Sequence, residues 1–177
     1  MNCLGLLFTA TECNGWPKLQ FLINDDLIQD HQFTSSSELI EIPLDLFDGA
    51  HELGIELYGK TTTNTVLVNN IIVEDQLVTL DTIFIDGVPV PDFVKYSGIY
   101  TVGQQQLPQA LTWGQNGIWK LKFNYPIIDW VLDLKFEKYY EFAGLDEWST
   151  STYHPKKSQL LESGFQELEN ILANVDV

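Results

Sequence analysis

Along much of this chain, apolar and polar residues alternate with a period of two, and this pattern constrains the fold more than any other feature. In the stretch 119–123, WKLKF, the three apolar side chains fall on one side of an extended backbone and the two lysines on the other. Such alternation is typical of a β-strand with one face buried and the other in solvent. The pattern recurs in 18–23 and 51–58, while 75–86 is apolar on both sides, which predicts a central strand covered on each face.

Short turn sequences separate these stretches. They are Asn14-Gly15, Asp48-Gly49, Asn69-Asn70, Asp86-Gly87, Ser97-Gly98 and Asn116-Gly117. Short strands broken by turns roughly every ten residues describe an antiparallel sandwich or jelly roll. A chain of 177 residues is also long enough to bury a core without disulfides or metals. We therefore predict an all-β fold, an antiparallel β-sandwich or jelly roll, over residues 1–142.

The stretch YPIIDWVLDLKF (125–136) fits two structures. Its apolar residues alternate from Trp130 to Phe136 as in a strand, whereas a proline followed by Asp129 is typical of a helix start. We favour the strand.

The C-terminal part of the chain has a different period. After a polar linker over 143–157, apolar residues recur in 158–177 at spacings of four and three, which predicts an amphipathic helix. The apolar stripe consists of Leu161, Phe165, Leu168, Leu172 and Val175. Because two heptads are too short for a self-sufficient coiled coil, this stripe is a predicted docking face, either on the chain's own sandwich or on a neighbouring subunit.

Residues 54–61, GIELYGKT, match the phosphate-binding pattern G-x-x-x-x-G-K-[ST] letter for letter. A phosphate loop needs small, pliable residues between its glycines and a helix after its lysine. Here three of the four middle residues are large and the fourth, Glu56, is an anion, and the run 61–66 is almost entirely β-branched. We therefore interpret the motif as a strand that ends in a Gly-Lys turn.

The charge balance narrows the range of partners. The chain has 9 cationic residues, all of them lysine, against 25 acidic ones, for a net charge of −16. Phosphate and base recognition depend on clustered cations, above all arginine, and an anionic membrane repels such a chain. We expect neither nucleic-acid binding nor membrane insertion. The N-terminal MNCLGLLFTA lacks a basic region and is too short to span a bilayer, so it is a predicted first strand.

Residues suited to catalysis show no catalytic pattern. The sequence has neither a nucleophile-elbow nor an H-E-x-x-H motif, and His31, His51 and His154 are far apart. His51 lies on the apolar side of its strand, which is typical of a hydrogen-bonded core histidine. Cys3 and Cys13 match no zinc or redox spacing, and both a bridge and two thiols stay open. We predict no enzyme, no catalytic residue and no resident cofactor, with a two-carboxylate hydrolase as a distant alternative.

Acidic residues gather near the predicted turns. Sandwich domains hold calcium with oxygen ligands from adjacent β-loops. The candidate calcium ligands are Asp25, Asp26, Asp48, Glu74 and Asp75. The sequence has no contiguous D-x-D-x-D-G loop, so solvated turn acids are the alternative.

Aromatic residues near turns form a second candidate site. They are Trp16, Tyr96, Tyr100 and Trp113. Such rings stack on sugars when they are exposed, and the alternative is that they belong to the core.

Two stretches resemble known families. Residues 49–88, from GAHELGIELYGKTTTNT to VEDQLVTLDTIFIDGV, resemble the paired strands of small β-sandwich carbohydrate-binding modules, in which a strand of the H-x-L-x-I-x-L kind precedes an acidic loop. Residues 49–136, above all WGQNGIWKLKFNYPIIDWVL (113–132), are similar to uncharacterised virion proteins of large tailed phages, notably marine cyanophages.

These resemblances imply two functions. The first is a non-enzymatic virion component (capsid decoration, neck, tail or baseplate) that is made in the host cytoplasm and contacts other virion proteins or copies of itself. It predicts an apolar patch of more than several hundred Å² on the isolated subunit. The alternative is a carbohydrate-binding module, calcium-assisted, that attaches a particle to a host surface.

Overall fold

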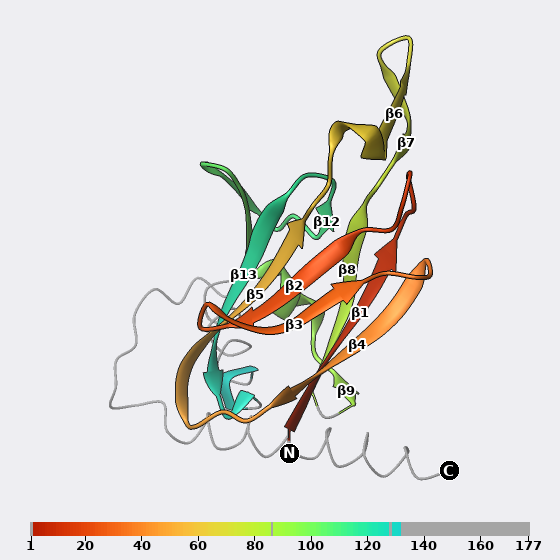
Figure 1. The fold of residues 1–177 in the computed structure, drawn as a ribbon. Coiled ribbons are helices and arrows are strands. Elements are labelled where there is room, and N and C mark those ends of the chain that lie inside the picture. Colours follow the sequence, from red (N-terminus) through yellow and green to blue (C-terminus); the bar gives the residue numbers. More distant parts are fainter. Residues whose placement is uncertain (1, 86, 128, 132–177) are drawn as a thin grey trace. The chain divides into compact units, whose positions relative to one another are not determined.

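The computed structural model describes residues 2–85, 87–127 and 129–131, all within one compact unit, Met1–Leu134 (Figure 1). The predicted linker (143–157) and the predicted helix (158–177), with its five docking residues, lie outside the described residues. Among the described residues, no helix is long and apolar enough to cross a membrane.

The described unit is a sandwich of two antiparallel sheets, as the alternation predicts. The first sheet has the order β12-β8-β1-β4, with β9 also paired to β8. Its strands are β1 (Asn2–Ala10), β4 (Ser37–Leu44), β8 (Val78–Ile85), β9 (Val88–Pro89) and β12 (Thr112–Trp113). The second sheet has the order β11-β10-β13-β5-β2-β3. Its strands are β2 (Lys18–Ile23), β3 (Asp26–Gln32), β5 (Gly49–Tyr58), β10 (Ile99–Val102), β11 (Gln105–Pro108) and β13 (Gly117–Tyr125).

Further elements of the described chain lie outside the two sheets. The strands β6 (Thr65–Val68) and β7 (Ile71–Asp75) form a separate hairpin. A 3-10 turn, η1 (Thr62–Asn64), precedes β6, and the short helix α1 (Asp92–Tyr96) lies against β8. The Lys95 ammonium of α1 donates a hydrogen bond to the Asp81 carbonyl of β8.

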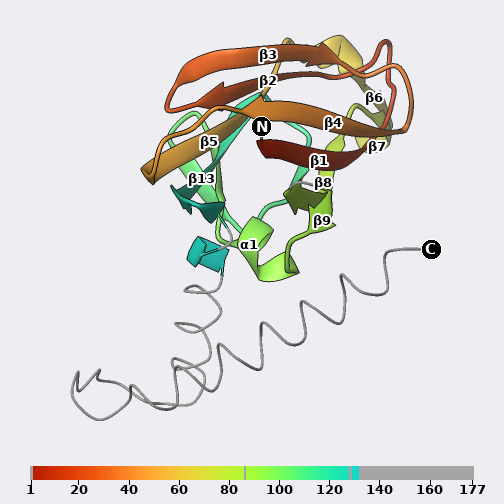
Figure 2. The ribbon, with the colours of Figure 1, turned by 90° about the horizontal axis from the view of Figure 1, so that it is seen from below.

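The core lies between the two sheets, which Figure 2 shows from below as two facing layers. Residues 119–123 of β13 follow the predicted alternation: Trp119, Leu121 and Phe123 are buried. Trp113 stacks on Tyr100 with ring centroids 5.1 Å apart and an interplanar angle of 5°. Since stacked and tilted aromatic rings fill much of the space between the sheets, they supply a large share of the buried apolar area.

Two sequence expectations differ from the structure. Asp75 belongs to β7, and β8 begins only at Val78. β8 is interior to its sheet, as predicted, but only one of its faces is fully buried, because the sandwich covers a sheet on one side. Residues 127 and 129–131 are helical, so the preferred strand over 125–136 is wrong there. Pro126 has no N–H to continue the ladder, and its carbonyl accepts a hydrogen bond from the Trp130 N–H at 3.3 Å, as in a helix start.

Candidate functional site

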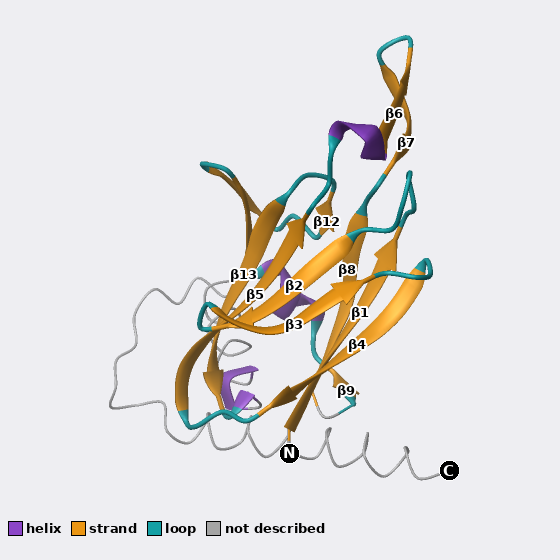
Figure 3. Cartoon of the chain, viewed as in Figure 1, coloured by secondary structure: helices purple, strands orange, loops and turns teal. Residues whose placement is uncertain are grey.

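The β6–β7 hairpin extends beyond the two sheets, with η1 at its base (Figure 3). Within the described chain, each of its strands pairs only with the other. Asn69 and Asn70 form the turn with φ angles of 52° and 63°, the left-handed conformation that a two-residue hairpin turn requires. The Asn69-Asn70 sequence therefore closes a tight turn at the tip of the hairpin.

The hairpin exposes large aliphatic side chains on both faces. They are Leu67, Val68, Ile71, Ile72 and Val73, each between 52% and 67% exposed. Leu67 is paired with Ile72, and Val68 with Ile71. Because paired residues share a face and successive residues point to opposite faces, each face carries one of these apolar pairs. Exposed apolar side chains gathered on one element make the hairpin a candidate interaction surface.

A buried lysine anchors the base of the hairpin. The Lys60 side chain is only 8% exposed. Its ammonium donates hydrogen bonds to the Asp75 carboxylate (2.6 Å) and to the carbonyls of Gln76 (2.7 Å) and Gly114 (2.6 Å). The Thr65 hydroxyl donates to the same Asp75 oxygen at 2.6 Å, so the first residue of β6 and the last of β7 share one anchor.

The electrostatics of this anchor favour its ionised form. Burial opposes ionisation of the Asp75 carboxyl, but the hydrogen bonds from Lys60 and Thr65 outweigh burial and hold the pKa of Asp75 below its usual value. The Lys60 ammonium has a partner for each of its donors, so its ion pair with Asp75 favours one geometry. This contact fixes the direction in which the hairpin leaves the sandwich.

A second set of contacts ties the hairpin to the loop after β1. The Asn64 amide donates to the Cys13 carbonyl at 2.9 Å, and the Gln76 amide donates to the Gly15 carbonyl at 2.8 Å. The Gln76 backbone N–H donates to the Asn64 carbonyl at 3.0 Å. Both stems of the hairpin are therefore held by the sandwich, while its tip is free of such contacts in the described chain.

The GIELYGKT stretch belongs to this anchor. β5 continues to Tyr58, and Gly59 has a φ of 74°, so the predicted strand that ends in a Gly-Lys turn is confirmed. A three-residue 3-10 turn follows instead of a long helix. Three protein oxygens already accept the three hydrogen bonds that the Lys60 ammonium can donate. The ammonium therefore stabilises the fold and has no N–H left for a phosphate.

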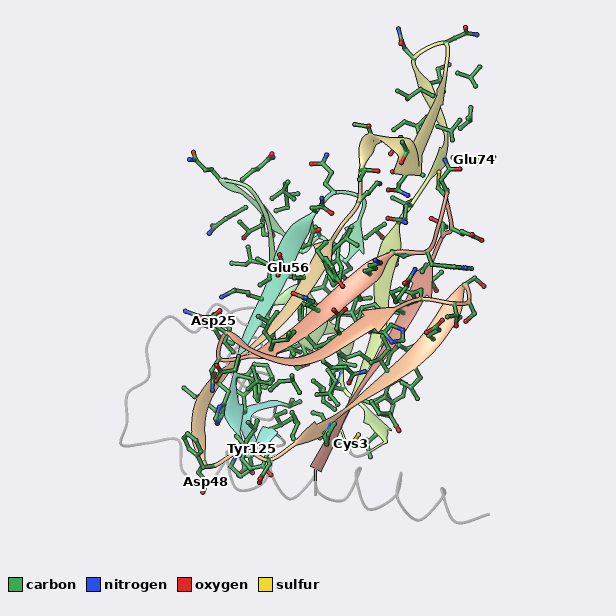
Figure 4. The ribbon with its side chains drawn as sticks, viewed as in Figure 1. Cys3, Asp25, Asp48, Glu56, Glu74 and Tyr125 are labelled. Carbon is green, nitrogen blue, oxygen red and sulfur yellow. The ribbon has the colours of Figure 1, made fainter. Side chains whose placement is uncertain are left out.

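The five calcium candidates do not come together. Asp25 and Asp26 lie at the β2–β3 turn, Asp48 precedes β5, and Glu74 and Asp75 lie in β7. Figure 4 shows Asp25, Asp48 and Glu74 in separate parts of the molecule. Over the described residues, no group of three or more His, Cys, Asp or Glu side chains is placed to hold a metal ion.

Two of these acids are instead occupied by lysines. Asp75 binds Lys60, and Asp25 accepts a hydrogen bond from the Lys120 ammonium at 2.8 Å. The Glu52 carboxylate also binds Lys120, at 2.6 Å. The hydrogen bonds that the Lys120 ammonium donates to Asp25 and Glu52 raise the pKa of Lys120. These acids serve as ion-pair partners for Lys60, in the turn after β5, and for Lys120 of β13.

Most of the aromatic candidates belong to the core. Trp113 and Tyr100 are fully buried, Trp16 is partly buried against the core, and Tyr96 is exposed. The sequence analysis missed Phe47, which is 77% exposed in the loop before β5.

The loop that carries Phe47 is held by His51, which is buried and hydrogen-bonded as predicted. The Phe47 carbonyl accepts a hydrogen bond from His51 Nε2 at 2.8 Å. The other ring nitrogen, Nδ1, accepts one from the Asn24 amide at 3.0 Å. With its proton on Nε2, the imidazole ring satisfies both contacts.

No protein-family model and no curated protein matches the sequence. Two solved structures are similar in fold. One is described as vCBM60 in complex with galactobiose, with a TM-score of 0.47, 12% identity, and coverage of 69% of this chain and 97% of that chain. The other, a selenomethionine form of vCBM60 from work on calcium-dependent carbohydrate-binding modules, has a TM-score of 0.48, 13% identity, and coverage of 68% and 90%. At these values the likeness assigns neither a ligand nor a site to this chain.

Proposed function

We propose that this protein is a non-enzymatic structural component that joins a larger assembly through protein–protein contacts made by the β6–β7 hairpin. One observation carries the proposal: five aliphatic side chains are exposed on a hairpin whose base is rigidly anchored. Two strands alone are marginally stable in water, and covering each half-exposed side chain gains roughly 1 kcal/mol. A partner that covers the hairpin therefore stabilises both the contact and the hairpin.

The resemblance of residues 49–136 to phage virion proteins supports a virion as this assembly, with the protein serving as a decoration, neck, tail or baseplate component. A hairpin with an uncharged tip suits such a role, because Thr65–Val73 contains no charged residue in a chain of net charge −16. Contacts made there bury no unpaired charge.

The proposal is tested by comparing three tagged chains: the wild type, an Ile71→Ser/Ile72→Ser variant, and a Leu39→Ser variant. Leu39 is an exposed aliphatic residue of β4, so it controls for the loss of surface hydrophobicity alone. We expect the hairpin variant to lose the proteins, or untagged copies of itself, that co-purify with the other two chains. If all three chains keep the same partners and the same oligomeric state, the hairpin is not the docking element.

A second candidate function is glycan binding, and the exposed Phe47 ring favours it. Phe47 lies between Asp45 and Asp48 in the sequence, on a loop whose backbone is held by His51. An exposed aromatic ring on such a loop is suited to stacking on a sugar. The similar solved structures are carbohydrate-binding modules, one of them with galactobiose bound.

This second function predicts that the wild type and Tyr96→Ala are retained on a galactan column, whereas Phe47→Ala is not. If calcium assists, a chelator removes the retention and calcium raises the melting temperature. A wild type that passes through the column unretarded, with and without calcium, contradicts this function for that glycan class.

A further inference from the structure

We propose that the partner of the hairpin is a second copy of this chain, paired through the outer edge of β6. The inference rests on the proposed function and names its partner, whose β6 covers the edge of the ribbon and brings the two Leu67 side chains together on one face. In the described part of the chain, β6 has β7 on one side and no strand on the other. The unpaired N–H and C=O groups of such an edge are a template for another strand.

The register of the hairpin selects β6 over β7 as the pairing edge. Val66 is paired with Glu74 and Leu67 with Ile72, so Val73 is an extra residue in β7. An extra residue forms a β-bulge, which bends the strand and interrupts its ladder. β6 has no extra residue, so its outer edge is the regular one.

The central part of β6 is self-complementary. Residues 66–68 read V-L-V, which is the same in both directions. In a two-fold antiparallel pairing about Leu67, leucine faces leucine and Val66 faces Val68 of the second copy. A shift by one residue places Val66 against Asn69, a turn residue whose φ of 52° does not continue an extended ladder.

The result is a four-stranded antiparallel sheet, β7-β6-β6-β7, with the two-fold symmetry of most homodimers. Four strands exceed the two-stranded ribbon that is only marginally stable in water. The paired segment contains no charged side chain, so no like charges are buried when two copies meet. The bodies, each of net charge −16, still repel each other, and salt screens that repulsion.

The charge therefore gives the dimer a distinctive salt response. Self-association of two acidic chains strengthens as salt rises from about 0.05 to about 0.5 M, whereas docking on a basic partner weakens. Sedimentation velocity of the 20.2 kDa chain across this range measures the response. A chain that stays monomeric at high salt and high micromolar concentration overturns the inference.

Cysteine cross-linking tests the register. Leu67 and Ile72 are paired neighbours with nearly equal exposure, 59% and 58%, so Ile72→Cys is a matched control for Leu67→Cys. On the two-fold axis the Cα atoms of two Leu67→Cys residues lie about 4.5 to 5.5 Å apart, within reach of a disulfide. Two Ile72→Cys residues are three strand spacings apart, roughly 14 Å.

We expect a disulfide dimer for Leu67→Cys on a non-reducing gel, and only the wild-type background for Ile72→Cys. The wild type sets that background because it keeps Cys3 and Cys13. Equal cross-linking of both variants means non-specific hairpin contact, and stronger cross-linking of Ile72→Cys means pairing through β7. Absence of cross-linking in both means no dimer at this edge. Each of these three outcomes overturns the inference.

A charge swap provides an independent test. Leu67→Lys and Leu67→Glu each place like charges across the axis, and we expect each to weaken the dimer at least tenfold, while their mixture forms a heterodimer. A mixture that stays monomeric contradicts the register. If the chain does not self-associate but Ile71→Ser/Ile72→Ser still loses another protein, self-pairing is wrong and the proposed function stands. If no partner depends on the hairpin, both are wrong.

Discussion

The strand β13 and the β6–β7 hairpin have the same extended backbone geometry, but they differ in which of their two faces are apolar and which are exposed. In β13, Trp119 and Leu121 are buried in the sandwich, while Lys120 points outward to Asp25 and Glu52. In the hairpin, the Leu67–Ile72 pair and the Val68–Ile71 pair are both apolar and both exposed. A strand with one apolar face can bury that face within its own chain. A ribbon that is apolar on both faces and lies outside the sheets leaves side chains exposed until a partner covers them.

The largest effect on the free energy of unfolding should come from a change in β13, whose apolar face is buried. Trp119→Ala empties the centre of the sandwich, and we expect it to lower the free energy of unfolding by about 3 to 5 kcal/mol. Urea denaturation followed by circular dichroism measures the loss. A loss below about 1 kcal/mol would show that the two sheets do not depend on this ring.

The anchor between the two regions comes next. Lys60→Met leaves the Asp75 carboxylate without its cation, and we expect a loss of about 3 kcal/mol. Hydrogen exchange should speed up most in β6 and β7, because their shared anchor is removed. Lys122→Met, a change at an exposed lysine of β13, is the control and should alter neither quantity. Unchanged exchange in the hairpin would show that its direction does not depend on Lys60.

A pH experiment addresses an ionic contact within the sandwich. Burial opposes ionisation of the Glu38 carboxyl, but hydrogen bonds from the Thr34 and Ser35 N–H groups and from His31 outweigh it and lower its pKa to about 2 from 4.5. The folded state therefore gains stability from Glu38 above pH 4.5 and loses it as the pH falls toward 2.

Glu38→Gln removes the charged acceptor, and we expect a loss of roughly 1.5 to 3 kcal/mol at pH 7. The difference between the wild type and Glu38→Gln should shrink steadily between pH 4.5 and pH 2. Melting temperatures recorded across that range provide the measurement. A difference that stays constant down to pH 2 would show that ionisation of Glu38 does not stabilise the folded state.

The smallest effect on the free energy of unfolding should come from a change in the exposed β6–β7 hairpin. Ile72→Thr removes an exposed side chain, so in dilute, monomeric protein it should change the free energy of unfolding by less than about 0.5 kcal/mol. The same variant should weaken association clearly. A large loss of monomer stability would mean that the chain itself covers the hairpin, which would remove the contrast with β13.

The sequence predicted the sandwich well because its signal is local. A period of two is set by the backbone of each strand, so WKLKF, the first strand and the buried His51 could be read without knowing the neighbours. The GIELYGKT motif was decided in the same way, since bulky residues between its glycines continue the strand.

The candidate sites were harder to predict because they depend on strand order. Asp25 and Asp75 both lie near turns, but they face different lysines in different parts of the fold. Trp113 and Tyr100 also lie near turns, and only the meeting of the two sheets shows that they stack in the core. Phe47 gave no signal in the sequence, because its exposure depends on how His51 holds the loop.

The sequence by itself determined that this chain forms strands with one face to bury, since side-chain direction alternates along any extended backbone. Only the tertiary structure decided which strands bury their apolar face against another part of the same chain. In the hairpin stretch VLVNNIIV, the sequence shows two apolar runs around an Asn-Asn turn but not whether a sheet covers them. Lys60 and Asp75 hold that stretch away from the sandwich, and so leave its apolar faces for a partner.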